Sequence, residues 1–443
     1  MEAVLHSELK KKYPVVDHAE GMYVYDTAGN RYLDCAAGIA VANIGHSVPE
    51  VLQAMEVQMK KTTFAYGGTF TSEARERLAQ QIIAMAPKGM SRVFFCSGGS
   101  EAMESVIKIA RQYQLERGCP SKYKIISRWQ SYHGNTIATL AMGGRPSWRE
   151  AFDACMPKAC HIAPCNCYRC PFGLAYGSCG LQCAKELERT ILYEGADTIA
   201  AFVLEPVIGT TAAAAIPPAD YIQEVKRICE AYDILFCVDE VITGFGRTGK
   251  NFAVDHFGIT PDIMGVAKGL GCGYMPMGAA IVHEKIVAAM EAGSGQGGHL
   301  FTFAANPLAC AAASAAMTYL QEHHLVERCA KMGALFLEKL KTLETLPFVG
   351  QVRGIGMMYG VEFVADKETK APLPNEVAIS SRVAAYCFTH GLMVTAGVQG
   401  CADGRHGEAM QIAPPFIITE EEMDFVVSTL QEAILAVAEE VQK

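Results

Sequence analysis

Short apolar runs alternate with amphipathic helical segments through the middle of this chain. The runs at residues 92–95, 123–126, 200–204, 234–238 and 262–266 have the length and composition of buried strands. The segments at 73–85, 102–110 and 221–231 place apolar residues at i, i+3, i+4 and i+7, as amphipathic helices do. Uniformly apolar strands separated by helices are typical of parallel sheets with both faces covered. The pattern predicts an α/β fold around a large, mostly parallel sheet.

The pattern changes toward both ends of the chain. From about residue 310, long helices surround one strand-like stretch at residues 357–363. Near the other end, residues 22–26 and 31–33 have the pattern of a hairpin around Gly29. We expect residues 61–310 to form a large domain. Residues 311–443 would form a smaller α+β domain, joined by an N-terminal segment, residues 1–60.

Composition excludes several classes of protein. The chain has 443 residues, half of them apolar, which is enough for a large core. Its formal charge is −9, and its longest basic run is Lys10-Lys11-Lys12, which argues against nucleic-acid binding. The N-terminus carries no apolar signal segment, and the apolar stretch at 308–320 is too short to span a bilayer. We therefore expect a cytoplasmic protein with no membrane or nucleic-acid partner.

Two glycine-rich motifs have the composition of phosphate-binding loops. Residues 97–101, Ser-Gly-Gly-Ser-Glu, precede a predicted helix, where free N–H groups, the helix dipole and the Ser100 hydroxyl favour an anion. A plain helix N-cap is the alternative. Residues 244–249 match the dinucleotide pattern G-x-G-x-x-G, but Asp239-Glu240 separates them from the preceding strand and no clear helix start follows. We favour the phosphate interpretation for the first motif only.

Two ionisable residues follow predicted strands. Asp239 lies at the carboxyl end of the 234–238 strand, where α/β folds place ligand-binding groups, although a surface loop is the alternative. Lys268 follows the 262–266 strand among Gly and apolar residues, where burial lowers the pKa of an amine toward the nucleophilic form. A solvated lysine is the alternative. With the phosphate motif, these residues offer a phosphate cradle, a carboxylate for a ring nitrogen and an amine for an aldehyde. That set complements pyridoxal 5'-phosphate (PLP).

These residues belong to a wider resemblance, which covers essentially the whole chain. The chain resembles the class III (subgroup II) PLP-dependent aminotransferases of fold type I, in particular the ω-aminotransferases. The resemblance implies an α/β fold with a mostly parallel, seven-stranded sheet between helices, and a homodimer with shared active sites. The residues that carry it are 26–34, Gly45-His46, 97–102, Tyr132-His133-Gly134, Glu205-Pro206-Val207, 238–249, Lys268-Gly269, Thr302-Phe303, 306–309 and Arg353-Gly354.

The resemblance also implies roles for individual residues. Lys268 is implied to form the internal aldimine with PLP and to shuttle the proton between substrate and cofactor. Asp239 is implied to keep the pyridine nitrogen protonated. Gly99 and Ser100 would bind the phosphate with help from Thr302 of the partner subunit. The other implied cofactor contacts are Tyr132 and Val241 on the two ring faces, His133, and Glu205 near the cofactor hydroxyl.

Departures from the family pattern bear on the substrate. Where the ornithine and 4-aminobutyrate branches carry an Arg three residues before a late Pro-Pro, this chain has Gln411, and Thr210 replaces a Glu after Gly209. Arg405 lies near the mobile Arg of the ω-aminotransferases. We expect a ping-pong enzyme that moves an amino group from an ω-amino acid or primary amine to pyruvate or 2-oxoglutarate. The expected substrate-pocket residues are Phe64, Tyr66 and Arg405.

Two alternatives to this function stay open. A racemase, aminomutase or decarboxylase on the same scaffold would use the same Lys268 and Asp239 and differ in how the substrate carbanion is reprotonated. A metal-binding or regulatory protein that kept the fold would not need Lys268, Asp239 and Thr302, which are all present.

Seven of the 17 cysteines lie between residues 155 and 183. The chain shows no secretory signal, so a disulfide framework is not expected. Such density is compatible with thiolate ligation of zinc or an iron–sulfur cluster, although neither standard spacing is reproduced. A disulfide or redox pair and plain buried thiols are the alternatives. The candidate ligands, in the pattern C-x-C-x2-C-x8-C-x3-C, are Cys165, Cys167, Cys170, Cys179 and Cys183.

Overall fold

A seven-stranded sheet forms the centre of the computed structural model, which describes residues 3–397 and 399–442. The strand order is β4-β10-β9-β8-β7-β5-β6. Strand β10 runs antiparallel to both of its neighbours, and all other neighbours are parallel. The mostly parallel, seven-stranded sheet is therefore confirmed. Its strands are β4 (Met90–Cys96), β5 (Lys124–Arg128), β6 (Cys160–Ile162), β7 (Ile199–Leu204), β8 (Leu235–Asp239), β9 (Ile263–Val266) and β10 (Gly278–His283).

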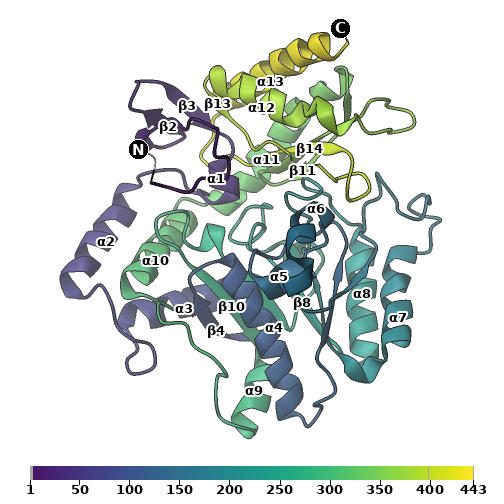
Figure 1. Cartoon of the computed structure of the whole chain (residues 1–443). Coiled ribbons are helices and arrows are strands. Elements are labelled where there is room, and N and C mark those ends of the chain that lie inside the picture. The colour runs from purple at the N-terminus through teal and green to yellow at the C-terminus, as the bar shows by residue number, and fades with distance from the viewer. Residues whose placement is uncertain (1–2, 398, 443) are drawn as a thin grey trace.

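Helices cover both faces of this sheet (Figure 1). Because side chains alternate along a strand, Ala201 and Val203 of β7 pack in the cluster that includes α4, whereas Phe202 and Leu204 pack in the cluster that includes α8. Every residue of β7 is buried, as expected of a central parallel strand. The helices around the sheet are α3 (Glu73–Met85), α4 (Gly99–Glu116), α5 (Ile137–Met142), α7 (Gln182–Glu194), α8 (Ala219–Ala231), α9 (Glu284–Ala292) and α10 (Pro307–Glu322).

Two smaller sheets lie together with the C-terminal helices on one side of the large sheet (Figure 1). Strand β13 pairs in parallel with β3, so the N-terminal hairpin and the C-terminal region share one sheet. The strands are β1 (Val16–Glu20), β2 (Tyr23–Asp26), β3 (Arg31–Asp34) and β13 (Leu392–Met393) in one sheet, and β11 (Val349–Ile355), β12 (Met358–Phe363) and β14 (Glu408–Ile412) in the other. The remaining helices are α1 (Ala37–Ala40), α2 (Pro49–Lys61), α6 (Pro146–Arg149), α11 (Leu325–Lys341), α12 (Ile379–Thr389) and α13 (Glu420–Val441), with short 3-10 turns between elements.

One apolar core runs from the small sheets into the large sheet. Leu392 of β13, Ile412 of β14 and Phe236 of β8 belong to the same cluster of buried side chains. The domain boundaries at residues 60 and 310 stay a prediction, and α10 crosses residue 310. Within the described ranges, no helix is both long and apolar enough to cross a membrane.

The predicted elements are present, with small shifts at their ends. The helix predicted at 73–85 is α3 with the same bounds, and the N-terminal hairpin is β2 with β3. Helix α4 extends beyond the predicted 102–110 in both directions, to Gly99 and Glu116. Strand β10 was not predicted, because its small residues, such as Gly278 and Ala280, lack the β-branched composition that marks a strand.

The motif at residues 244–249 is a packing turn. Gly249 has φ +82°, and a Cβ atom there would lie 2.9 Å from Ala330 Cα. Within the motif, Arg247 is fully buried and donates hydrogen bonds to Met357 O (2.9 Å), Pro414 O (2.6 Å) and Asn43 Oδ1 (2.6 Å). This guanidinium therefore joins the large sheet to the N-terminal and C-terminal segments. The close packing at Gly249 explains why a glycine stands there, so the motif does not require a bound nucleotide.

Candidate active site

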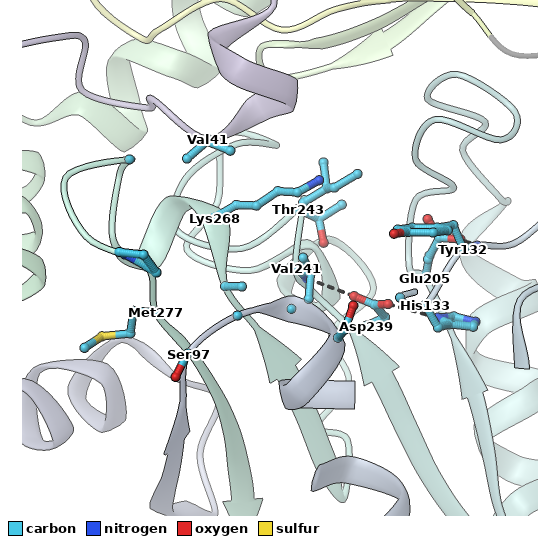
Figure 2. Close-up of a pocket in the computed structure, with 18 of the residues that line it drawn as sticks. Val41, Ser97, Tyr132, His133, Glu205, Asp239, Val241, Thr243, Lys268 and Met277 are labelled. Atoms are coloured by element: carbon cyan, nitrogen blue, oxygen red, sulfur yellow. Dashed lines mark hydrogen bonds and ion pairs between the residues drawn. The ribbon is translucent and has the colours of Figure 1, made fainter. Parts of the chain in front are cut away.

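A cavity of about 410 Å³ lies at the carboxyl ends of the parallel strands. Ligand sites of α/β sheets are found at this edge, and the volume suits a small cofactor. Figure 2 shows that the side chains come from separate loops and meet in this cavity. Its lining includes the predicted residues Gly99, Ser100, Tyr132, His133, Glu205, Asp239, Val241 and Lys268.

Asp239 and His133 form a buried pair beneath the cavity. His133 Nδ1 lies 2.9 Å from Asp239 Oδ2, and the two residues are 2 % and 5 % exposed. Because a carboxylate only accepts hydrogen bonds, Nδ1 carries the proton and donates it. Asp239 Oδ1 also accepts from Val241 N (3.0 Å). The carboxylate is thus held by two donors from opposite sides, as the dashed lines in Figure 2 show.

Lys268 reaches into the same cavity from the turn after β9 (Figure 2). Its backbone has φ +34°, a left-handed conformation that costs a non-glycine residue energy and is common at functional sites. Burial lowers the pKa of Lys268 to about 8, against the opposing effect of the Asp239 and Glu205 carboxylates. A substantial fraction of the amine is therefore neutral near physiological pH, as a nucleophile requires.

Glu205 organises the side of the cavity that Tyr132 lines. Its Oε1 accepts from Tyr132 N (3.0 Å) and its Oε2 from Gly209 N (2.7 Å). Burial raises the pKa of Glu205 above its ordinary value. Its backbone carbonyl accepts from Nη2 of the fully buried Arg128 (2.6 Å). Arg128 was not singled out from the sequence, where nothing distinguishes an arginine that ends a strand.

The glycine-rich motif opens the 18-residue helix α4. No side chain caps this helix at Gly98, so its first N–H groups remain available to an anion. A Cβ atom at Gly99 would lie 3.0 Å from Val241 Cγ1, so glycine lets the loop approach Val241 closely. Ser100 Oγ accepts from Asn135 N (2.9 Å), which fixes the hydroxyl at the helix end. Backbone donors, a hydroxyl and a helix dipole converge here, as phosphate binding requires.

Four predicted residues lie outside the cavity of a single chain. Thr302 lies on an exposed turn before α10. Phe64 and Tyr66 are 44 % and 45 % exposed on the segment between α2 and α3. Arg405 is on an exposed loop, where its Nη1 pairs with Glu150 Oε1 at 2.7 Å. The structure of one chain therefore does not bring these residues to Lys268.

The metal-site hypothesis for the cysteine cluster is not supported. Across residues 3–397 and 399–442, no group of three or more His, Cys, Asp or Glu side chains is arranged to hold a metal ion. Of the five candidate ligands, Cys165 is buried, Cys167 is exposed, and Cys170, Cys179 and Cys183 are half-buried. All five predicted ligands are free thiols.

Some lining residues had no signal in the sequence. Val41 comes from the N-terminal segment, and Met275 and Met277 come from the loop before β10. Apolar residues at such positions are indistinguishable in sequence from ordinary core residues. Thr243 lies within the family motif at 238–249 and was quoted for the resemblance without a role.

The donor set fits PLP. Asp239 is a fixed carboxylate suited to a protonated ring nitrogen, Lys268 is an amine with a lowered pKa, and the start of α4 is an anion site. The Cβ atom that Gly99 lacks leaves room between α4 and Val241. The cavity thus offers a partner for each functional group of the cofactor.

Comparisons with known proteins agree with this chemistry. The family model "Aminotransferase class-III" matches residues 6–434. The "Uncharacterized aminotransferase YodT" of Bacillus subtilis is 38 % identical over 99 % of both chains, and the "Putrescine--pyruvate aminotransferase" of Pseudomonas aeruginosa is 34 % identical over 95 % of this chain and 90 % of its own. An amine transaminase from an uncultivated Pseudomonas species, solved with PLP bound, has a TM-score of 0.91 at 32 % identity and covers 99 % of this chain and 98 % of its own. This chain belongs to the class III aminotransferases, which are PLP-dependent enzymes of fold type I.

Proposed function

We propose that this enzyme transfers an amino group from an ω-amino acid or primary amine to a 2-oxo acid, pyruvate or 2-oxoglutarate, in two half-reactions. The observation that carries the proposal is the meeting of the Lys268 amine and the His133–Asp239 pair in one cavity. The Pseudomonas aeruginosa relative is named for a diamine donor and pyruvate, which supports this substrate class. The family relationship favours amino transfer over racemisation or decarboxylation.

Each residue has a distinct task in this proposal. PLP, when bound, supplies an aldehyde and a ring that withdraws electrons from the substrate carbon. Lys268 holds the aldehyde and then moves a proton as a general base and acid. Asp239, positioned by His133, keeps a proton on the ring nitrogen. The start of α4 with Ser100 binds the phosphate, while Tyr132 and Val241 confine the ring.

We also propose that the active enzyme is a homodimer in which Thr302 completes the phosphate site of the partner subunit. Phe64 and Phe303 lie edge to face with centroids 5.9 Å apart, and Phe303 is 67 % exposed. Leu300 and Phe70 are exposed near the same two segments. An exposed apolar patch of this kind is typical of a subunit interface. A mixture of Lys268→Ala and Thr302→Val subunits tests this, because only hybrid dimers contain one intact site and regain activity.

A buried positive charge that has no acidic partner among the described residues supports a substrate that carries a carboxylate. Arg145 is 3 % exposed, and its Nη1 has no hydrogen-bond partner among the described residues. Burial lowers the pKa of Arg145 to about 10, and its guanidinium lies 4.4 Å from the Trp148 ring centroid. Trp148 in turn packs edge-on against Tyr132, 5.1 Å between centroids. A 2-oxo acid or ω-amino acid would supply the anion that Arg145 lacks.

Arg405 is a second candidate for binding this carboxylate. Arg405 pairs with Glu150, and the side chains of both partners are exposed. Exposed ion pairs contribute only about 0–1 kcal/mol, so release from Glu150 costs little. We therefore propose that Arg405 leaves Glu150 when a carboxylate-bearing substrate binds.

The proposal is tested by assaying the PLP-loaded enzyme with paired substrates. Putrescine, 4-aminobutyrate, β-alanine and an arylalkyl amine are each incubated with pyruvate or 2-oxoglutarate, and alanine or glutamate is quantified. The proposal predicts amino-acid formation in proportion to the consumed donor. Consumption of an amine without any 2-oxo acid, over many turnovers, would instead assign the enzyme to the racemase or decarboxylase alternative.

A further inference from the structure

Two surface segments carry predicted site residues that do not line the cavity of their own chain. Residues 62–70, between α2 and α3, carry Phe64 and Tyr66, and residues 301–306, before α10, carry Thr302. Helix α10 packs against both α2 and α3, which brings the two segments to the same part of the surface (Figure 1). We call residues 62–70 and 301–306 the paired segments.

Direct contacts join the paired segments to each other. Asn306 Nδ2 donates a hydrogen bond to Thr63 O at 2.9 Å. The rings of Phe64 and Phe303 lie edge to face, with their centroids 5.9 Å apart. Asn306 also caps α10, because its Oδ1 accepts from Leu308 N at 2.9 Å. One residue therefore fixes the end of the second segment and binds it to the first.

A single guanidinium on α3 binds both paired segments. Arg75 Nη1 donates to Phe70 O at 3.3 Å, and Arg75 Nη2 donates to Ala304 O at 3.1 Å. Phe70 ends the first segment, and Ala304 lies two residues after Thr302. Because a guanidinium presents its N–H groups in a rigid, planar fork, it holds the two carbonyls at a fixed separation.

Arg75 is itself fixed by its surroundings. It is half-buried on the first turn of α3, where Ser72 Oγ, the N-cap of this helix, accepts from Arg75 N at 3.3 Å. A Cβ atom at Gly67 would lie 2.8 Å from Arg75 Nη2, so the first segment comes close to the guanidinium. Leu78 and Ile82 anchor α3 in the core. Arg75 therefore connects the paired segments to a helix that is held in the core.

We propose that Arg75 is a positioning residue, which holds the paired segments in the arrangement that completes the active site of the partner subunit. The proposal rests on the proposed homodimer, in which Thr302 contributes to the phosphate site of the other chain. Because the segments are joined, Phe64 and Tyr66 accompany Thr302 to that site. Phosphate binding and donor binding then depend on one guanidinium, which itself touches neither cofactor nor substrate.

Amide hydrogen exchange of the cofactor-free protein tests whether Arg75 holds the segments. In Arg75→Met, which keeps an apolar stem, we expect faster exchange in both paired segments and unchanged exchange from Leu78 onward in α3. Arg77→Met is the matched control, because Arg77 lies on the same helix and is exposed. Arg75→Lys, whose ammonium cannot act as a fork, is the second variant and should show the same effects to a smaller degree. Unchanged exchange of the paired segments in both Arg75 variants would overturn the proposal, whatever the activity of the enzyme.

Cofactor affinity separates positioning from a general loss of structure. Thr302 is proposed to serve the phosphate, so Arg75→Met should raise the dissociation constant of PLP by roughly tenfold or more, as loss of one hydrogen bond to a charged group does. The dissociation constant of pyridoxal, which lacks the phosphate, should change little. Absorption titration of the cofactor-free protein measures both. Equal weakening of PLP and pyridoxal would show that Arg75 acts on the fold as a whole and would overturn the positioning role.

Two hybrid dimers, isolated through different affinity tags on the two chains, test whether Arg75 acts across the interface. In the first, an Arg75→Met chain is paired with a Lys268→Ala chain, so the remaining Lys268 is completed by segments that keep Arg75. In the second, a wild-type chain is paired with a chain that carries both substitutions, so the remaining Lys268 is completed by segments that lack Arg75. Both hybrids contain the same substitutions in total. At limiting PLP we expect the first hybrid to be roughly tenfold more active or better.

A reference pair distinguishes failure of this inference from failure of the proposed homodimer. Equal activity of the two hybrids would overturn the role of Arg75 when hybrids of Lys268→Ala and Thr302→Val chains do regain activity. If these reference hybrids regain none, the shared site is wrong, and the role of Arg75 across the interface is overturned with it.

Discussion

His133 Nδ1 and Asp239 Oδ2 lie 2.9 Å apart, and both residues are buried, with His133 2 % and Asp239 5 % exposed. The histidine comes from the loop after β5 and the aspartate from the end of β8, so the bond holds together two loops of the cavity. The carboxylate cannot rotate away without breaking this bond and the one from Val241 N. Asp239 is therefore presented to the cavity in one orientation.

The first prediction concerns this pair. Asp239→Asn removes the negative charge expected to keep the ring nitrogen protonated, and loss of one such electrostatic partner lowers kcat by roughly 10²–10³-fold. His133→Asn removes one hydrogen bond to a charged group, worth about 1.5–3 kcal/mol, so we expect a smaller loss of about tenfold or more. The two variants are compared with wild type by steady-state kinetics and by the pH dependence of the bound cofactor's absorption. Equal activity of Asp239→Asn and wild type would contradict the assignment.

The second prediction concerns the pH dependence of stability of the cofactor-free protein. The pKa of Lys268 is about 8 in the folded chain and 10.5 ordinarily. Below pH 8 the folded chain therefore buries a charged amine, and the destabilisation of the fold by this burial is greatest. Between these values the unfolded chain binds more protons, and stability rises with pH. Lys268→Met removes the cost. We expect the variant to have the higher Tm at pH 7 and this difference to shrink as pH rises toward 10.5. A difference that grows with pH in thermal unfolding would contradict the buried-amine account.

The third prediction concerns substrate recognition. Arg145→Gln should lower kcat/KM for pyruvate and 4-aminobutyrate, because hydrogen bonds between charged groups contribute about 1.5–3 kcal/mol. It should leave the half-reaction with an arylalkyl amine, which carries no carboxylate, nearly unchanged. Arg149→Gln is the matched control, since Arg149 stacks on Trp129 and pairs with Asp153. An equal loss for both classes of substrate would show that Arg145 acts on the fold and not on a carboxylate.

The fourth prediction concerns Arg247. Its guanidinium donates to three acceptors in separate segments, and charged hydrogen bonds contribute roughly 1.5–3 kcal/mol each. Arg247→Ala should therefore lower the free energy of unfolding by about 3 kcal/mol or more. Arg227→Ala, at a surface pair with Glu224 in which the arginine side chain is 58 % exposed, should change it by about 0.5 kcal/mol or less. Denaturant titration of both variants compares them, and similar effects would refute a joining role for Arg247.

Much of the fold could be predicted because its signals are local. The apolar strands β7 and β8 and the amphipathic helices α3 and α8 carry patterns that tertiary contacts do not override. Strand β10 escaped prediction because its Gly and Ala residues are not strand formers, although Gly278 lets the strand approach the Gly98 carbonyl closely. Its antiparallel direction is set by pairing with β4 and β9, which a single sequence does not reveal.

The residues of the site also fall into those that could be predicted from the sequence and those that could not. Glu205 and Lys268 come soon after strands and Asp239 ends one, and the parallel sheet alone brings them to one edge. Residues supplied by distant loops do not follow from strand order. Arg405 was expected near the substrate, yet it pairs with Glu150, and Thr302 lies on the surface of its own chain. The cysteine spacing predicted a metal site because spacing alone does not report how the thiols are oriented, and no metal-holding group of side chains forms among the described residues.

The most direct test of the central claim is a single half-reaction of the PLP-loaded enzyme with amine alone. Visible absorption of the cofactor is followed while the released aldehyde or ketone is quantified. Amino transfer through Lys268 predicts bleaching that stops after one equivalent of carbonyl product per chain, recovery of the band on addition of pyruvate with one equivalent of alanine, and neither change in Lys268→Ala. Continued product formation without pyruvate, or an unchanged wild-type spectrum with every amine tested, would contradict the account.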